Sequence, residues 1–258
     1  MHTSYVLRRS FLAACLVSSP TAWGQSLAGL VARSKGSVVA VGSFSALRSP
    51  RFSFSGTGFV LGDGTLVATC LHVLPDLVVS TERVELSVQL QSERGDLEWR
   101  AAKVLVRDRA RDLCLLRLEG APAPALSLTE HEAADSVEGT SVALMGYPLG
   151  GALGFSVVTH RGIISSRVSS TAPAPSSGTL SDRAVLSARS GAFDLLQLDA
   201  TAYPGNSGGP LVNVDSGAVI GVVSMVLVKG TRESALSSPT GITYAVPAKY
   251  VAAMLKRI

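Results

Sequence analysis

Short apolar runs, separated by polar clusters with glycine or proline, recur along nearly the whole chain. The runs are rich in valine, leucine and isoleucine, and their spacing is typical of the strands of a sandwich or of paired barrels. The pattern predicts about a dozen strands, at residues 37–41, 56–61, 66–69, 84–90, 102–106, 113–118, 141–146, 156–165, 195–198, 210–214, 218–228 and 242–246.

Helical periodicity appears in residues 27–33 and in the tail 248–258, where Val251, Met254 and Leu255 fall on one face. These two segments are predicted to be helices. The Gly62-Asp63-Gly64 sequence indicates a hairpin turn.

Two stretches break the strand pattern. Residues 119–125 are rich in proline and alanine and indicate a linker, whereas residues 169–191 are rich in Ser, Ala and Pro and indicate a long loop. The simplest assembly is an all-β fold of two six-stranded antiparallel β-barrels. The expected boundaries are residues 25–120 for the N-terminal barrel, 121–134 for the linker, and 135–258 for the C-terminal barrel with its terminal helix.

The composition is that of a globular protein, since 47% of the 258 residues are hydrophobic and 16% are charged. The formal net charge is +4. The arginines are scattered and form no basic stripe interleaved with aromatic residues, which argues against nucleic acid as a partner.

Residues 1–24 are typical of an export signal. Arg8 and Arg9 form a positive start that resembles a twin-arginine motif, a short apolar segment follows, and small residues lie just before Gln25. Cleavage after Gly24 is favoured over lipidation at Cys15, because too few residues separate Arg9 from that cysteine. No later segment is long and apolar enough to span a membrane. We therefore expect an exported protein, periplasmic or secreted.

The strongest chemical signal is a serine surrounded by glycines, in the octet from Tyr203 to Pro210. Gly205, Gly208 and Gly209 around Ser207 indicate a sharp backbone turn that approaches another segment closely. Such a setting can expose a serine Oγ while nearby N–H groups point into one space, as acyl transfer requires. An ordinary glycine-rich turn between strands is the alternative interpretation.

A nucleophilic serine needs a base, and His72 is the best candidate among the four histidines. It closes a predicted buried strand just before a turn, which holds an imidazole rigidly yet lets it face a cleft. His2 belongs to the signal, His131 follows the linker in a polar stretch, and His160 lies within a strand-like run, where a structural role is more plausible.

Asp112 is the candidate for the acid that orients this base. It begins a strongly apolar strand, where a lone carboxylate needs a hydrogen-bond partner. Asp108 lies among arginines and is interpreted as a solvated turn residue.

The segments around His72, Asp112 and Ser207 occur in that order and resemble the chymotrypsin-fold serine proteases, most closely the bacterial HtrA/Deg type. The residues that carry the resemblance are Thr69-Cys70-Leu71-His72-Val73, Asp112-Leu113-Cys114-Leu115-Leu116, Gly205-Asn206-Ser207-Gly208-Gly209-Pro210, Gly56-Thr57-Gly58-Phe59-Val60, Gly162-Ile163-Ile164-Ser165 and Tyr244-Ala245-Val246-Pro247. The Gly-x-Ser-x-Gly elbow of α/β-hydrolases also fits the octet. That fold requires a histidine after the serine, however, and all four histidines precede Ser207.

The resemblance implies roles for individual residues. Ser207 would be the nucleophile, His72 the general base and Asp112 the residue that holds the imidazole tautomer, and the Gly205 and Ser207 N–H groups would form the oxyanion hole. The substrate cleft would include Thr201, Tyr203, Val223 and Ser224, with Ser224 supporting Asp112. Thr201 replaces the aspartate of trypsin-type enzymes, so the expected pocket is small and apolar and does not favour Lys or Arg.

Cys70 and Cys114 each lie two residues from a member of this triad. Side chains two apart on a strand share a face, so a Cys70–Cys114 disulfide is one hypothesis and two buried thiols are the other. Without a CxxC or Cys/His ligand motif, neither a metal nor another cofactor is expected.

We therefore expect an exported HtrA/Deg-like serine endopeptidase of polypeptides, without a PDZ domain, acting in envelope protein quality control or processing. A catalytically idle peptide-binding or chaperone-like protein on the same fold is the alternative. The intact set of His72, Asp112 and Ser207 disfavours it. The oligomeric state and the physiological substrate stay open.

Overall fold

The computed structural model describes residues 26–75, 84–91, 96–150, 155–170, 191–224 and 241–258. The expected signal segment 1–24 with Cys15, and most of the predicted loop 169–191, lie outside the described residues.

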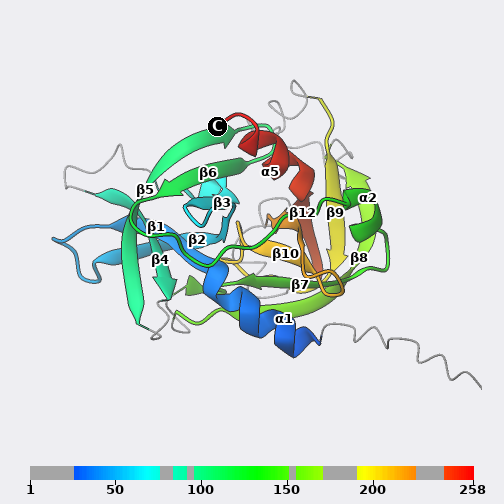
Figure 1. Cartoon of the computed structure of the whole chain (residues 1–258), viewed down its shortest axis with the longest axis horizontal. Coiled ribbons are helices and arrows are strands. Elements are labelled where there is room, and N and C mark those ends of the chain that lie inside the picture. Colours follow the sequence, from blue (N-terminus) through cyan, green and yellow to red (C-terminus); the bar gives the residue numbers. More distant parts are fainter. Residues whose placement is uncertain (1–25, 76–83, 92–95, 151–154, 171–190, 225–240) are drawn as a thin grey trace, which may run out of the picture.

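In the described part of the chain, twelve antiparallel strands close into two barrels, seen side by side in Figure 1. The first barrel has the order β1-β2-β3-β6-β5-β4, with β1 Val38–Phe44, β2 Phe52–Leu61, β3 Leu66–Cys70, β4 Glu85–Gln91, β5 Leu97–Asp108 and β6 Leu113–Leu118. The second has the order β10-β11-β12-β9-β8-β7, with β7 Ser141–Gly146, β8 Val158–Ser169, β9 Asp194–Asp199, β10 Pro210–Asn213, β11 Val219–Val223 and β12 Ile242–Pro247. The predicted all-β class with two six-stranded barrels is confirmed.

Helices are few and short in the described part of the chain. The structure has α1 Leu27–Ser34, α2 Glu132–Asp135 and α5 Ala248–Leu255, with 3-10 turns η1 Lys35–Ser37 and η2 Leu71–Val73. Helix α1 begins after Ser26, whose Oγ accepts a hydrogen bond from Gly29 N at 3.1 Å, as an N-cap serine does. Both predicted helical segments are therefore helices in the structure.

The segment between the barrels is tied to both of them. Leu126 N donates to Val60 O of the first barrel at 2.9 Å, and Val219 N of the second barrel donates to Ser127 O at 2.8 Å. Because its backbone pairs with a strand on each side, this connection fixes the two barrels relative to each other.

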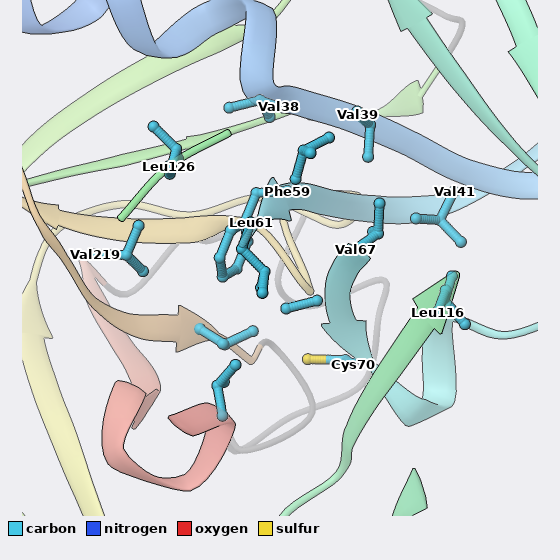
Figure 2. Close-up of a cluster of buried hydrophobic side chains, with 14 of the residues drawn as sticks. Val38, Val39, Val41, Phe59, Leu61, Val67, Cys70, Leu116, Leu126 and Val219 are labelled. Atoms are coloured by element: carbon cyan, nitrogen blue, oxygen red, sulfur yellow. The ribbon is translucent and has the colours of Figure 1, made fainter. Parts of the chain in front are cut away.

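One apolar cluster joins the first barrel to the interface between the barrels. It includes Val38, Phe59 and Cys70 of the first barrel and Val219 of the second (Figure 2). A separate cluster fills the interior of the second barrel, with Leu144, Ile164, Leu196, Leu198, Leu211 and Ala245 among its members. The contact between the barrels is thus a continuation of the first barrel's core.

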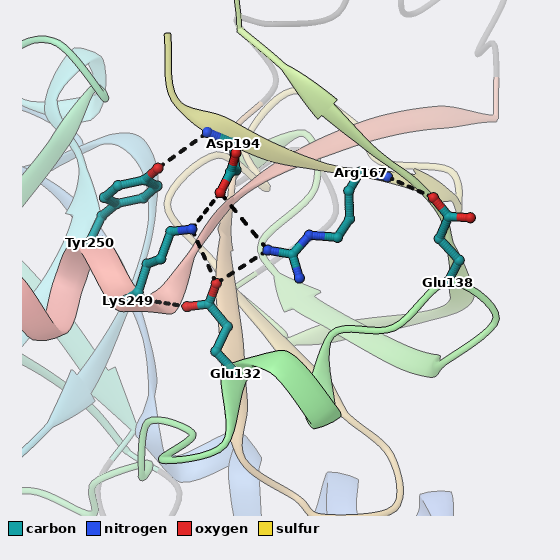
Figure 3. Close-up of polar contacts among 6 residues, drawn as sticks. All are labelled: Glu132, Glu138, Arg167, Asp194, Lys249 and Tyr250. Atoms are coloured by element: carbon teal, nitrogen blue, oxygen red, sulfur yellow. Dashed lines mark hydrogen bonds and ion pairs between the residues drawn. The ribbon is translucent and has the colours of Figure 1, made fainter. Parts of the chain in front are cut away.

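A polar network holds helix α5 against the second barrel (Figure 3). Glu132 of α2 accepts a hydrogen bond from Lys249 N at 3.0 Å, in the first turn of α5, where Pro247 provides no side-chain cap. Lys249 Nζ lies 2.5 Å from Asp194 Oδ2, and Arg167 Nη2 lies 3.5 Å from Glu132 Oε1. The hydrogen bond from Lys249 lowers the pKa of Asp194. Each partly exposed ion pair adds little, but together they fix the position of α5.

The barrel core makes a matched stability test possible. Leu116 is fully buried in β6, whereas Leu47 is 78% exposed. Leu116→Ala is expected to lower the free energy of unfolding by about 2–5 kcal/mol, because it removes buried methyl groups and leaves a cavity. Leu47→Ala is expected to change it by about 0.5 kcal/mol or less. Urea unfolding of both variants measures the difference, and equal losses would contradict this core assignment.

Candidate active site

His72 lies at the point where the chain leaves the first barrel. Strand β3 ends at Cys70, and the 3-10 turn η2 then carries the imidazole out of the barrel wall. The His72 side chain is 29% exposed, while the residues on either side of it are held by buried neighbours. The imidazole is therefore accessible, while the backbone that carries it is held in place.

Asp112 lies beside this imidazole, in the turn before β6. Its Oδ2 lies 2.5 Å from His72 Nδ1, and its Oδ1 accepts a hydrogen bond from His72 N at 3.1 Å. Leu71 N also donates to the Asp112 carbonyl at 2.8 Å. The main chain and the side chain of Asp112 are thus both bound to the turn that carries His72. Asp112 is only 5% exposed and has a φ of 61°, in the left-handed region. Burial and these hydrogen bonds leave its carboxylate facing Nδ1.

The neighbouring Asp108 has a different partner. Its carboxylate accepts hydrogen bonds from Arg111 N at 3.1 Å and from Arg111 Nη1 at 2.8 Å. The Arg111 guanidinium also lies 4.3 Å from the centre of the Tyr250 ring in α5, a cation–π contact. Asp108 thus supports the turn that carries Asp112, and the turn is anchored to the C-terminal helix.

Ser207 lies between β9 and β10 and is tied to the first barrel through its backbone. Thr57 N of β2 donates to Ser207 O at 2.9 Å, and Thr57 Oγ1 donates to Gly205 O at 2.6 Å. Thr69 Oγ1, on the strand that leads to His72, donates to Thr57 O at 2.7 Å. This chain of hydrogen bonds brings the segment of Ser207 against the end of β3, and Ser207 itself is 5% exposed.

Two glycines beside Ser207 are required by their backbone. Gly208 has a φ of 87°, and a Cβ there would lie 2.1 Å from Thr57 O and 3.0 Å from Cys70 N. Gly205 has a φ of 104°, and a Cβ there would lie 2.2 Å from Tyr147 O. Both glycines therefore permit the turn, and Gly208 also permits the close approach to Thr57 of the first barrel.

The peptide unit between Pro204 and Gly205 is oriented by Leu149. Leu149 N donates to Pro204 O at 2.7 Å, although Leu149 itself has a φ of 58°, a strained value for a branched side chain. The C=O and N–H of a trans peptide point in opposite directions. With its carbonyl bound to Leu149, this unit directs the Gly205 N–H away from Leu149.

The residues expected to line the substrate cleft have different environments. Thr201 is half-buried and lines a shallow surface pocket with Arg161 and Asp199. The half-buried Tyr203 ring packs on His160, with 5.7 Å between ring centres. The Val223 side chain is buried in the core of the second barrel, so it contacts the Ser207 segment through its backbone, which accepts a hydrogen bond from Gly208 N at 2.8 Å.

The structure contradicts the expected support of Asp112 by Ser224. Ser224 is fully buried, and its Oγ has no hydrogen-bond partner among the described residues. Its backbone N donates to Tyr244 O at 2.9 Å. Asp112 is held instead by the His72 backbone and side chain.

The hypothesised Cys70–Cys114 disulfide is also wrong. Both residues are buried thiols. Across β3 and β6, Cys70 is opposite Leu113, whereas Cys114 is opposite Thr69, so the two sulfurs point to opposite faces of the sheet. Sequence spacing does not place the two cysteines on one face, because His72 and Asp112 both lie outside the strands, in a 3-10 turn and a left-handed turn.

Sequence reasoning missed Thr57 and Leu149, which hold the Ser207 segment through hydrogen bonds to main-chain atoms. Thr57 stands in a segment that carries the family resemblance, between Gly56 and Gly58 of a predicted strand, but nothing in that segment indicates its contacts with the Ser207 segment. It also missed that Cys70, His72 and Asp112 offer one ligand atom each within 4.8 Å of one another, an arrangement able to hold a metal ion.

Comparisons with known proteins agree with this geometry. Residues 56–222 match the family described as "Trypsin-like peptidase domain", and the chain belongs to this family. Human serine protease HTRA3 is 30% identical over 244 residues, which cover 93% of this chain and 46% of that protein. The "Probable periplasmic serine endoprotease DegP-like" of Pseudomonas fluorescens is 28% identical over 200 residues, 78% of this chain and 35% of that protein.

The chain spans less than half the length of these relatives. Among solved structures, the serine endoprotease from Yersinia pestis has the same fold, with a TM-score of 0.59 at 21% identity, covering 88% of this chain and 64% of that one. The resemblance to HtrA/Deg-type proteases is confirmed. Among the described residues, no helix has the length and apolar character needed to cross a membrane.

Thr57 provides a test of the link between the barrels. In Thr57→Val, the buried Gly205 carbonyl and the Tyr147 N–H, which donates to Thr57 Oγ1 at 3.0 Å, both lose their partner. The expected loss of unfolding free energy is about 2–5 kcal/mol. The matched control Thr243→Val leaves only the Ala200 carbonyl unpaired and should cost about 1–3 kcal/mol. Urea unfolding of both variants measures the two losses. If Thr57→Val loses no more stability than Thr243→Val, Thr57 does not have the proposed role in linking the barrels.

His160 provides a test of pH dependence. Burial lowers its pKa, because the charged imidazole is poorly solvated beside Tyr203. In the unfolded chain the pKa of this histidine is about 6.5, so as the pH falls the unfolded chain takes up a proton before the folded protein does. The folded state therefore loses stability in acid. Between about pH 7.5 and about pH 5.5, His160→Leu should therefore lose less stability than the wild type in urea unfolding. His131→Leu, which replaces an exposed imidazole, is the control, and an unchanged pH slope for His160→Leu would contradict the prediction.

Proposed function

We propose that the protein is a serine endopeptidase that hydrolyses peptide bonds of polypeptides through an acyl-enzyme. One observation carries this proposal: a buried carboxylate, Asp112, lies 2.5 Å from Nδ1 of an accessible imidazole, His72, and the glycine-flanked Ser207 is hydrogen-bonded through its backbone to the same barrel. Family membership and the names of the relatives, which are serine proteases, support the same activity.

In this proposal, Ser207 Oγ attacks the scissile carbonyl while His72 Nε2 takes its proton. Asp112 keeps the other proton on Nδ1 and stabilises the imidazolium that forms. His72 then gives the proton to the leaving amine, and a water molecule hydrolyses the acyl-enzyme by the same steps in reverse order.

The Gly205 and Ser207 N–H groups would stabilise the oxyanion. The hydrogen bond from Leu149 N to Pro204 O supports this assignment, because it turns the Gly205 N–H to the side away from Leu149 before substrate binds. A preorganised donor of this kind contributes about 3–4 kcal/mol of transition-state stabilisation.

The substrate side chain would enter a pocket near Thr201 and Tyr203. Thr201 carries no charge that would attract Lys or Arg, and the Tyr203 ring, packed on His160, would form one wall of the pocket and limit its size. A small or moderately sized uncharged side chain is therefore the proposed preference.

Export to the cell envelope, with a role in protein quality control or processing, completes the proposal. It rests on the signal-like residues 1–24, with cleavage after Gly24, and on the periplasmic location in the name of the DegP-like relative. A catalytically idle, peptide-binding protein remains the competing function, and the experiment below distinguishes the two.

Labelling with a fluorophosphonate probe tests the activity. The wild type should be labelled, whereas Ser207→Ala and His72→Ala should not, because the first removes the nucleophile and the second its base. Ser165→Ala, an exposed serine of β8, should be labelled like the wild type. Asp112→Asn should slow peptide hydrolysis by roughly 10⁴-fold, because it stabilises the wrong imidazole tautomer. A folded wild type that is never labelled would favour the idle protein.

A further inference from the structure

The thiol of Cys70 lies close to the His72–Asp112 pair. Cys70 is fully buried at the end of β3, two residues before His72, and its Sγ lies 3.3 Å from Val223 O. Its sulfur, a His72 ring nitrogen and an Asp112 carboxylate oxygen all lie within 4.8 Å of one another. The proposed reaction uses the histidine and the aspartate but gives the thiol no task.

We propose that Cys70 Sγ, His72 Nδ1 and the Asp112 carboxylate form a binding site for a thiophilic divalent cation of the Zn²⁺ class. Occupation of the site inhibits the enzyme, so it is a regulatory site built into the catalytic pair. The binding stands on geometry alone, whereas the inhibition rests on the proposed function.

The spacing of the three groups suits a tetrahedral ion. Bonds of about 2.0–2.3 Å place neighbouring ligand atoms about 3.3–3.7 Å apart. The present distance of 2.5 Å between His72 Nδ1 and Asp112 Oδ2 is shorter than this, so the pair must open slightly. Asp112 is buried and held by backbone hydrogen bonds, and the partly exposed imidazole is the group with room to move. Three protein ligands leave the fourth position to water.

The protons balance without any further reagent. The Cys70 thiol releases its proton to solvent when Sγ binds the ion, and the proton on His72 Nδ1 moves to Nε2, so one proton is released for each ion bound. Binding is therefore favoured as the pH rises. In the occupied site Nε2 carries a proton and cannot accept one from Ser207, and Asp112 no longer faces an Nδ1–H group. Both functions of the pair are lost together.

The chemistry of the ligands selects the ion. A thiolate and an imidazole favour Zn²⁺ and Co²⁺, whereas Mg²⁺ and Ca²⁺ prefer sites made of oxygen atoms. Cys114, the other described cysteine, points to the opposite face of the sheet and cannot join the site. It therefore provides a matched control for the loss of one buried thiol.

Cobalt titration of the inactive Ser207→Ala protein tests the binding without any need for activity. One Co²⁺ should bind with a sulfur-to-cobalt charge-transfer band in the near ultraviolet. The band should persist when Cys114→Ala is added and disappear when Cys70→Ala is added, with circular dichroism showing that each protein is folded. Absence of the band, or its persistence without Cys70, would overturn the proposal.

Zn²⁺ inhibition of fluorophosphonate labelling tests the consequence. Zn²⁺ should slow labelling of the wild type and of Cys114→Ala, and a chelator should restore it. When the labelling rate of each protein is expressed relative to its own metal-free rate, Cys70→Ala should need at least roughly tenfold more Zn²⁺ than the wild type for the same inhibition. Equal sensitivity of Cys70→Ala would overturn the regulatory role. If no protein is labelled at all, the proposed function fails, and the cobalt titration still decides the metal site.

Discussion

The arrangement of the whole molecule depends on the backbone contact between Thr57 and the segment around Ser207. Strand β2 donates to Ser207 O and to Gly205 O, and glycines on the facing segment let the main chains approach at distances that a Cβ would prevent. The apolar interface continues the first barrel's core around this contact. His72 and Asp112 belong to the first barrel and Ser207 to the second, so the packing that stabilises the fold also sets the distance between them.

Much of the fold was predictable because most strands have a recognisable pattern of apolar residues in their own sequence. The valine- and leucine-rich runs between turn residues indicate strands wherever one face is buried, and Ala248–Leu255 shows its helical period plainly. The end of β8 at Ser169 was missed because its last residues, Ser165 to Ser169, are mostly polar or exposed. The connection between the barrels looked like a loose linker, since backbone pairing of Leu126 and Ser127 leaves no trace in side-chain type.

The pairing of His72 with Asp112 was predictable from the sequence, whereas the residues that hold the Ser207 segment were not. A histidine at a strand end and an aspartate at the start of an apolar strand each require a partner, and the structure places them together. The disulfide hypothesis assumed regular strands around the cysteines, yet His72 and Asp112 lie in turns. The role of Ser224 came from the family resemblance, and its Oγ has no hydrogen-bond partner among the described residues. The orienting contact of Leu149 is made by a main-chain N–H, which every residue except proline has.

The left-handed backbone of Asp112 restricts what evolution can place there. Few residues adopt a φ of 61° without strain, and aspartate and asparagine are among those that do. A glutamate has the same charge but a longer side chain and less tolerance of this conformation. Two independent demands, one on charge and one on backbone shape, therefore converge on a single amino acid. Replacing Asp112 by another acidic residue is therefore expected to cost more than the conserved charge alone would suggest.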